Sequence, residues 1–293
     1  MHYTVMGRKL FMERAGEGAP SVVFLAGAGA VGQDYWRLMD RVSELTTAVV
    51  YDRSGTGWSE RPPGWLPDCG ETVGELRELL RVAGVPAPYL LVGHSLGALF
   101  ARLYAIRHPD EVAGLIFMDP AHEDYEASMP QELRERRAAF DPADQELPEE
   151  LPEEILDFYR SLFGRMMADW PAEICEPLIE AHVGRDWLAD GFRVLKDVGG
   201  YYDEVRQAGP LPDVPLIVLT ATDIDDFKRA VSAGEPEALL AAETDAKRRL
   251  YDTLAASVPR GENRLVKASG HASLPWLGGD AVVEAIRDLL PGG

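Results

Sequence analysis

The sequence predicts an α/β fold in which a mostly parallel sheet carries helices on both faces and a helical stretch is inserted. Short apolar runs such as SVVFLA (21–26) and TAVVYD (47–52) have no polar alternation, as is typical of buried strands. Helical patterns alternate with these runs, which favours parallel strands. No buried strand is predicted between residues 120 and 212, where Pro, acidic residues and helix formers predominate.

The elements are expected in the following order. Residues 3–14 form a strand or hairpin, and 21–26 form the first buried strand. Asp34 is predicted to cap a helix that extends to about residue 45. Further strands are expected at 47–52, 89–93, 112–119, 214–221 and 263–268. Further helices are expected at 71–83, at 96–108 before Pro109, and at about 280–290.

The insertion divides the predicted domains into a core of residues 1–121 and 211–293 and a helical cap of residues 122–210. Apolar residues recur at helical spacing from Ile155 to Trp170, which favours a helix packed on its neighbours. Five aromatic residues of the cap are candidates for lining a pocket, although burial in the cap explains them equally well: Tyr125, Tyr159, Trp170, Trp187 and Tyr201.

Composition limits the partners that the chain is expected to bind. The formal net charge is −20 and the pI about 4.7, which argues against nucleic acid and anionic membranes. Two cysteines make no disulfide framework, and the six histidines show no metal-binding spacing. The N-terminal residues lack the apolar core of a signal peptide, and a cytoplasmic protein is expected. The oligomeric state is not predicted.

One glycine pattern suggests a nucleotide cofactor. Gly27, Gly29 and Gly32 spell G-x-G-x-x-G directly after a buried strand, and Asp52 ends the next strand, 20 residues after Gly32. That arrangement is typical of an NAD(P)-binding turn with an acid for the ribose hydroxyl. This hypothesis explains residues 22–52 and leaves the motifs below without a role.

The strongest motif is Gly93-His94-Ser95-Leu96-Gly97, which has the form G-x-S-x-G. An apolar strand precedes it and a helix follows it, and the flanking glycines permit a sharp turn that exposes the serine hydroxyl. Ser95 is therefore predicted to be a nucleophile, with the helix N-terminus below it facing a developing oxyanion.

A serine nucleophile needs a base to take its proton. His271 is the candidate, because it follows the last predicted strand within KASGHASLPW, where Gly270 lets the loop turn. His94 adjoins Ser95 but is expected to point away from a tight elbow and to be structural, as is His108 at a helix end.

Taken together, these motifs resemble the α/β-hydrolase fold superfamily, and the resemblance covers essentially the whole chain. The matching pieces include the AGAG turn, YDRSGTGWS, GHSLG, FMDPAHED and the late SGH. Within this superfamily, the chain is most similar to a bacterial subgroup that carries AGxG where many other members have His-Gly. The resemblance implies an oxyanion turn in which the N–H groups of Ala28 and Leu96 are the donors, and a mainly structural Asp52. Ala26 replaces the usual His of that turn.

The resemblance implies hydrolysis of a small-molecule acyl substrate without a cofactor, through a Ser-His-Asp triad and an acyl-enzyme. A carboxylic ester is the leading substrate class, and a lactone or thioester is the alternative. Epoxide and haloalkane hydrolysis are disfavoured, because those relatives use a carboxylate nucleophile.

The acid of the triad has two candidate positions. In most of the superfamily it follows the strand after the cap, where Asp223 and Asp225 lie near the usual position and Asp226 lies further on. In a minority it ends the strand after the nucleophile helix, which here is Asp119. Asp119 is favoured, because a carboxylate at the carboxyl end of a parallel strand faces the active-site edge of the sheet.

Overall fold

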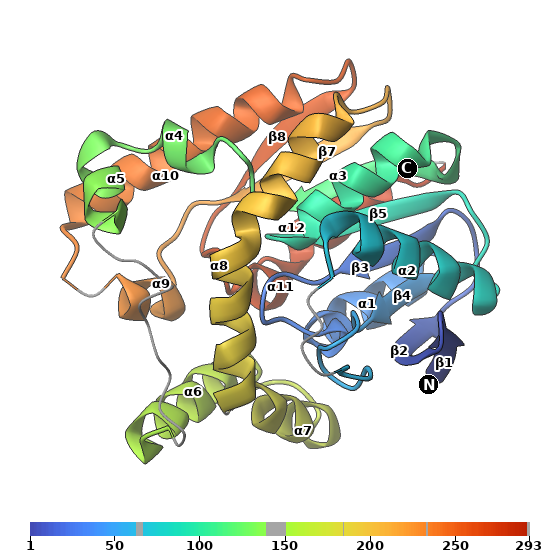
Figure 1. Cartoon of the computed structure of the whole chain (residues 1–293), viewed down its shortest axis with the longest axis horizontal. Coiled ribbons are helices and arrows are strands. Elements are labelled where there is room, and N and C mark those ends of the chain that lie inside the picture. The colour runs from blue at the N-terminus through green and yellow to red at the C-terminus, as the bar shows by residue number, and fades with distance from the viewer. Residues whose placement is uncertain (63–66, 139–150, 184, 233, 292–293) are drawn as a thin grey trace.

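The computed structural model of the chain describes residues 1–62, 67–138, 151–183, 185–232 and 234–291. An eight-stranded sheet crosses the molecule in the order β1-β2-β4-β3-β5-β6-β7-β8 (Figure 1). Its strands are β1 (His2–Val5), β2 (Arg8–Ala15), β3 (Ser21–Leu25), β4 (Ala48–Tyr51), β5 (Tyr89–His94), β6 (Val112–Met118), β7 (Leu216–Ala221) and β8 (Gly261–Val266).

The first two strands form an antiparallel hairpin, and β2 also pairs antiparallel with β4. All remaining pairs are parallel, which confirms the predicted mostly parallel sheet. Parallel pairing brings the carboxyl ends of β3, β5, β6, β7 and β8 to one edge, and the loops that follow them can therefore meet there.

Helices cover both faces of the sheet, as predicted (Figure 1). One face packs against α2 (Cys69–Val82), α3 (Gly97–Arg107), α8 (Arg185–Ala208) and α10 (Glu237–Ala255). The other face packs against α1 (Trp36–Ser43) and α12 (Gly279–Leu289). Side chains along β3 alternate between the two layers: Val23 joins the first and Val22 the second. Both faces of β3 are thus buried, which explains its uninterrupted apolar sequence.

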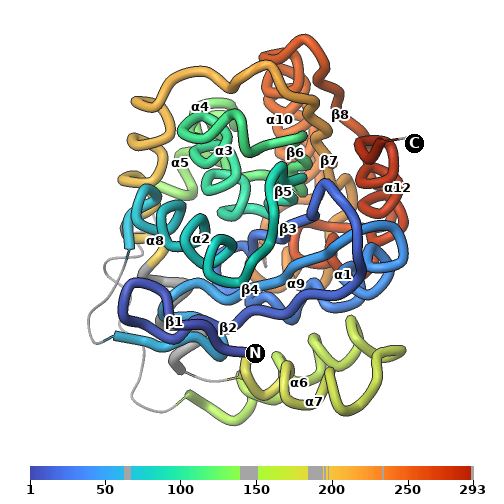
Figure 2. The backbone as a smooth tube through the Cα atoms, turned by 90° about the vertical axis from the view of Figure 1, so that its right-hand side faces the viewer, coloured from blue at the N-terminus to red at the C-terminus, as the bar shows by residue number. Residues whose placement is uncertain are grey.

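The segment between β6 and β7 is helical in its described part. It contains α4 (Tyr125–Ser128), α5 (Gln131–Ala138), α6 (Glu153–Met166), α7 (Ala172–His182) and α8. Figures 1 and 2 show α6 and α7 side by side at one end of the molecule, whereas α4 and α5 lie near α10. Because α8 packs on α2 and α3, part of the insertion belongs to the layer over the sheet. The proposed division into core and cap stays a prediction.

Several local expectations need correction or addition. Asp34 does not cap α1: it lies within the 3-10 turn η1 (Gly32–Tyr35), and its Oδ2 accepts a hydrogen bond from the Val31 N–H at 2.8 Å. The second helix begins two residues earlier than predicted, because Asp68 caps it through the Glu71 N–H. The long helix α10 had no counterpart among the predicted elements, and it carries a residue that contacts the site.

The helix predicted around the apolar stripe is α6, but only part of the stripe is buried. Phe163, Met167 and Trp170 form a small apolar cluster with Leu178 of α7. Ile155 and Phe158 are about two-fifths exposed instead.

Candidate active site

Ser95 lies at a sharp turn between β5 and α3. Its φ angle is 50°, a region that non-glycine residues rarely adopt. The turn requires glycine on both sides: a Cβ on Gly93 would lie 2.6 Å from the Ala98 Cα, and one on Gly97 would lie 2.0 Å from the Leu25 carbonyl oxygen. The close packing that the motif predicts is therefore present, and it projects Ser95 from the strand tip.

His271 follows β8 and reaches Ser95 from across the sheet edge. Its Nε2 lies 3.1 Å from the Ser95 Oγ, and its Nδ1 lies 2.7 Å from the Asp119 Oδ2. The Nδ1–H donates to the carboxylate, so Nε2 is left to accept the serine proton. Gly270 permits this approach, because a Cβ there would lie 2.4 Å from the Asp225 carboxylate.

The structure brings Asp119, and not the later aspartates, against His271. Asp119 follows β6, has a φ of 44° and is 1% exposed. Asp223 accepts a hydrogen bond from the Ile224 N–H instead. Asp225 caps α9 (Asp226–Val231) through the Lys228 N–H and also accepts from the Ser273 N–H. The Asp225 side chain thus holds the loop that carries His271 through the main-chain N–H of Ser273.

One contact of Asp119 had no signal in the sequence. Lys247, from the middle of α10, places its Nζ 2.9 Å from Oδ1 and 3.0 Å from Oδ2 of Asp119. The Ala221 N–H donates to Oδ1 as well, at 3.0 Å. Burial alone would raise the pKa of Asp119, but the Lys247 ammonium and the His271 ring outweigh it and hold the pKa below its ordinary range. Asp119 is therefore a carboxylate at neutral pH.

The turn after β3 lies beside Ser95. A Cβ on Gly27 would come within 3.2 Å of the Ser95 Cβ. Arg53 holds this turn: its Nη1 donates to the Ala26 carbonyl and its Nη2 donates to the Gly27 carbonyl at 2.8 Å. Arg53 also lies over the Phe100 ring at 5.3 Å. Arg53 therefore holds two successive carbonyls of this turn.

The two predicted oxyanion donors differ in exposure. Ala28 is exposed on the turn, and Leu96 is buried at the start of α3. In the described part of the chain, neither N–H donates a hydrogen bond to another group of the protein. Their role as oxyanion donors remains a prediction.

His94 is buried, as its expected structural role requires. Its Nε2–H donates to the His271 carbonyl at 2.9 Å, and its Nδ1 accepts from the Tyr35 hydroxyl at 2.8 Å. Burial, reinforced by the nearby His271 ring, lowers the pKa of His94 to about 3. His94 is thus a neutral support beneath the loop that carries His271.

Gly32 and Asp52, which suggested a nucleotide cofactor, contact each other. The Gly32 N–H donates to the Asp52 Oδ1 at 2.6 Å, and the Trp58 N–H donates to Oδ2 at 2.8 Å. A Cβ on Gly32 would lie 2.9 Å from the Tyr51 backbone. Packing and turn geometry account for both residues without a ligand. Within the described residues, no three His, Cys, Asp or Glu side chains are grouped to hold a metal ion.

A cavity of about 380 Å³ opens beside the Asp119–His271 pair. Among the residues that line it are Tyr125, Tyr202, Phe227, Lys228, Glu243 and Lys247. Of the aromatic candidates in the cap, Tyr125 lines this cavity, whereas Trp170 packs against Trp36 and Tyr201 packs against Phe100. The side chain of Trp187 lies outside the described residues. A larger hollow of about 690 Å³ lies near Tyr89 and His108, at the amino ends of β5 and β6 and away from Ser95.

No helix in the described residues is both long enough and apolar enough to span a bilayer.

The family model described as "Alpha/beta hydrolase family" matches residues 22–285. Among curated proteins, uncharacterized protein YqjL of Bacillus subtilis is 32% identical over 120 residues, which are 41% of this chain and 47% of that protein. Putative carbamate hydrolase RutD of Enterobacter cloacae is 34% identical over 103 residues, which are 34% of this chain and 37% of that protein. The chain thus spans less than half the length of the curated relatives it first matches.

Solved structures match over nearly the whole chain. A mutant epoxide hydrolase of Vigna radiata aligns with a TM-score of 0.72 and 17% identity, over 99% of this chain and 97% of that one. A thermophilic esterase of Thermogutta terrifontis aligns with a TM-score of 0.60 and 19% identity, over 98% of this chain and 96% of that one. At these identities the likeness shows a shared fold.

Proposed function

The chain belongs to the alpha/beta hydrolase family, and from that premise we propose that it is a serine hydrolase that cleaves a carboxylic ester through an acyl-enzyme. The observation that carries the proposal is the unbroken hydrogen-bonded series from Ser95 through His271 to Asp119, with spacings of 3.1 and 2.7 Å. These spacings lie within the range needed for proton transfer from a nucleophile to its base.

In the proposed reaction, His271 Nε2 takes the Ser95 proton as Oγ attacks the acyl carbon. Asp119 holds the Nδ1–H tautomer and stabilises the imidazolium. His271 then returns the proton to the leaving alcohol and later activates a water molecule that releases the acid. The Ala28 and Leu96 N–H groups would stabilise the negative oxygen of each tetrahedral intermediate.

An acyl substrate is favoured over an epoxide or a haloalkane because the elbow carries a serine and not a carboxylate. The fold shared with an epoxide hydrolase does not alter this, since reaction type depends on the residues of the site. Lactones and thioesters use the same chemistry, and a lactone-degrading enzyme is among the proteins with this fold. They are the alternative substrate classes.

Fluorophosphonate labelling tests the proposal, because only an activated serine reacts. We expect the wild type to be labelled at Ser95 and to hydrolyse p-nitrophenyl esters, and Ser95→Ala to lose both while its melting temperature stays nearly the same. Ser128→Ala is the matched control, since Ser128 is exposed on α4. Ester turnover near the wild-type rate in Ser95→Ala would contradict the proposed nucleophile.

Substrate class is tested separately with chain-length series of p-nitrophenyl esters, aliphatic lactones and acyl thioesters. A higher kcat/KM for esters than for lactones and thioesters supports a carboxylic ester as the substrate class. A clear preference for lactones or thioesters would replace it without altering the proposed nucleophile.

A further inference from the structure

Lys247 contacts both oxygens of the carboxylate that faces His271, although it lies 128 residues from Asp119 in sequence. We propose that Lys247 is a positioning residue that keeps Asp119 charged and oriented towards His271, and that its positive charge thereby shapes the pH dependence of the proposed reaction. This inference rests on the proposed function, because it assigns Lys247 a part in the same site.

The geometry makes Lys247 an integral neighbour of the pair. Its side chain is 10% exposed and that of Asp119 is 1% exposed, so water screens the contact poorly. Oδ1 accepts from the Ala221 N–H and Oδ2 accepts from the His271 Nδ1–H. Lys247 spans the two oxygens and so fixes the carboxylate plane in which His271 is held.

Asp52 shows what such burial does without a contacting ammonium group. It is also 1% exposed and accepts two backbone N–H hydrogen bonds. Burial raises the pKa of Asp52 to about 6, and these bonds only partly offset the effect. The pKa of Asp119 is shifted in the opposite direction, with Lys247 as the largest opposing influence. A buried carboxylate at this position therefore depends on Lys247 to stay ionised.

The same charge also lies close to the His271 ring. Lys247 Nζ and His271 Nδ1 both bond to Asp119 Oδ2, at 3.0 and 2.7 Å, so the two nitrogen atoms are near neighbours. When His271 takes a proton during the proposed reaction, the imidazolium faces a carboxylate that is already paired with Lys247, and a like charge lies close by. We therefore expect the charge of Lys247 to move the pH dependence of the proposed reaction.

Other titratable groups that face the pair come from several elements. They are His94 of β5, Tyr125 of α4, Tyr202 of α8, Asp223 and Asp225 around the start of α9, and Glu243 and Tyr251 of α10. His94 is neutral above its pKa of about 3, and burial raises the pKa of all three tyrosines, which keeps them neutral. Glu243 is paired with Lys228 and Arg137. In the described part of the chain, Lys247 is therefore the cation in direct contact with Asp119.

The test is the pH dependence of kcat/KM for a p-nitrophenyl ester in Lys247→Met, Lys247→Gln and Lys247→Arg. Loss of the charge should raise the midpoint of the acid limb by roughly one to two pH units in the Met and Gln variants. Lys247→Gln retains a hydrogen-bond donor and so separates charge from orientation. Lys247→Arg should restore the midpoint most of the way towards wild type. Lys228→Met is the matched control, since it removes a lysine of the same cavity that pairs with Glu243, and it should move the midpoint much less.

A second measurement does not depend on turnover. The His271 imidazole resonance, assigned by its loss in His271→Asn, is titrated by NMR in the wild type and in Lys247→Gln. We expect the Asp119–His271 pair to take up its proton at higher pH in the variant. If the midpoints of the wild type and of the Lys247 variants are equal in both measurements, the role of Lys247 is overturned, even if Ser95 is labelled by fluorophosphonate. Absent labelling with a shifted NMR midpoint would instead overturn the proposed function and leave the electrostatic coupling established.

Discussion

His94 donates a hydrogen bond of 2.9 Å from its Nε2–H to the main-chain carbonyl of His271, and the two rings lie 5.2 Å apart. On its other side His94 accepts from Tyr35, whose oxygen lies 3.4 Å from the Gly27 N–H. A buried polar connection therefore runs from the turn after β3 to the loop after β8. It ties the proposed oxyanion turn and the proposed base to one rigid support.

His94 should make stability fall as the pH is lowered. Its pKa is lowered from 6.5 to about 3 in the folded protein, so the unfolded chain binds an extra proton within that window. The stability is fully present above pH 6.5 and is lost as the pH falls towards 3. His94→Asn should remove a slope of up to about 1.4 kcal/mol per pH unit from the free energy of unfolding. Urea unfolding at several pH values in this window measures it.

The control for that experiment is His2→Asn, because His2 is exposed on β1. Asp52 changes the stability with pH in the opposite sense, because burial raises its pKa to about 6. Its contribution is the same in the wild type, His94→Asn and His2→Asn. Identical slopes in wild type and His94→Asn would mean that His94 does not titrate between the folded and unfolded states.

The identity of the acid is tested by paired substitutions. Asp119→Asn should lower kcat by up to about 10⁴-fold, because the amide no longer holds the Nδ1–H tautomer of His271. It should also lower the melting temperature, since Lys247 would be left buried without its counter-charge. Asp223→Asn should stay within about tenfold of wild type, because its side chain contacts the Ile224 N–H and not His271. A large loss in Asp223→Asn and a small one in Asp119→Asn would assign the acid to Asp223.

Arg53 should matter for rate more than for substrate binding. Its guanidinium contacts two successive carbonyls of the proposed oxyanion turn, which a lysine at this position cannot match in geometry. Arg53→Lys is expected to lower kcat by about ten- to a hundredfold with little effect on KM, because the Ala28 N–H would be less well placed. Steady-state kinetics measures the split. Arg249→Lys, an exposed position on α10, is the control, and an equal loss there would contradict the assignment.

The sequence alone is enough to predict the individual strands and the Ser95 elbow, because both are set by local patterns. The elbow needs only a buried strand, two glycines and a following helix, all within a short stretch. The choice between Asp119 and Asp223 is not local, since each lies at a strand end and only the paths of the loops decide which one meets His271. No local sequence pattern indicates the contacts that Arg53 and Lys247 make. Each acts through a long side chain whose target is set by the packing of an element far away in sequence.

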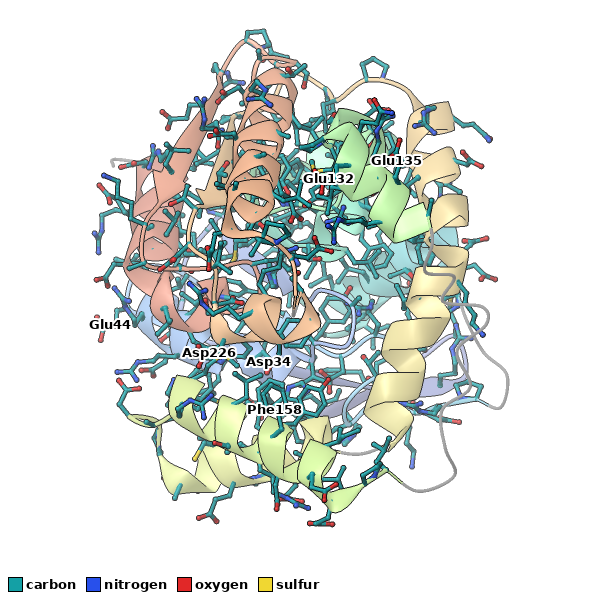
Figure 3. The ribbon with its side chains drawn as sticks, turned by 90° about the vertical axis from the view of Figure 1, so that its left-hand side faces the viewer. Asp34, Glu44, Glu132, Glu135, Phe158 and Asp226 are labelled. Atoms are coloured by element: carbon teal, nitrogen blue, oxygen red, sulfur yellow. The ribbon has the colours of Figure 1, made fainter. Side chains whose placement is uncertain are left out.

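A contact with a distant element also explains why Asp34 does not cap a helix, contrary to the expectation from the sequence. Its position before an apolar pattern favours a helix cap, but α7 of the insertion supplies His182, whose Nε2–H donates to Asp34 Oδ1 at 2.8 Å. Both side chains are about 2% exposed or less. In Figure 3, Asp34 lies just above Phe158 of α6, on the side of the insertion. Asp34 thereby joins the insertion to the end of the proposed oxyanion turn through the Val31 N–H.

This buried pair yields the last prediction, which concerns how the insertion acts on the turn. His182→Phe keeps an aromatic ring stacked on Phe163, which lies 4.7 Å from the His182 ring, but it removes the donor to Asp34. A buried carboxylate oxygen without that donor should cost about 1–3 kcal/mol of unfolding free energy. Fluorophosphonate labelling of Ser95 should also slow, because the Val31 end of the turn is held by the same carboxylate. A double-mutant cycle with Asp34→Asn measures the coupling between the two side chains. Additivity within about 0.5 kcal/mol, together with an unchanged labelling rate, would show that α7 does not act on the turn through this pair.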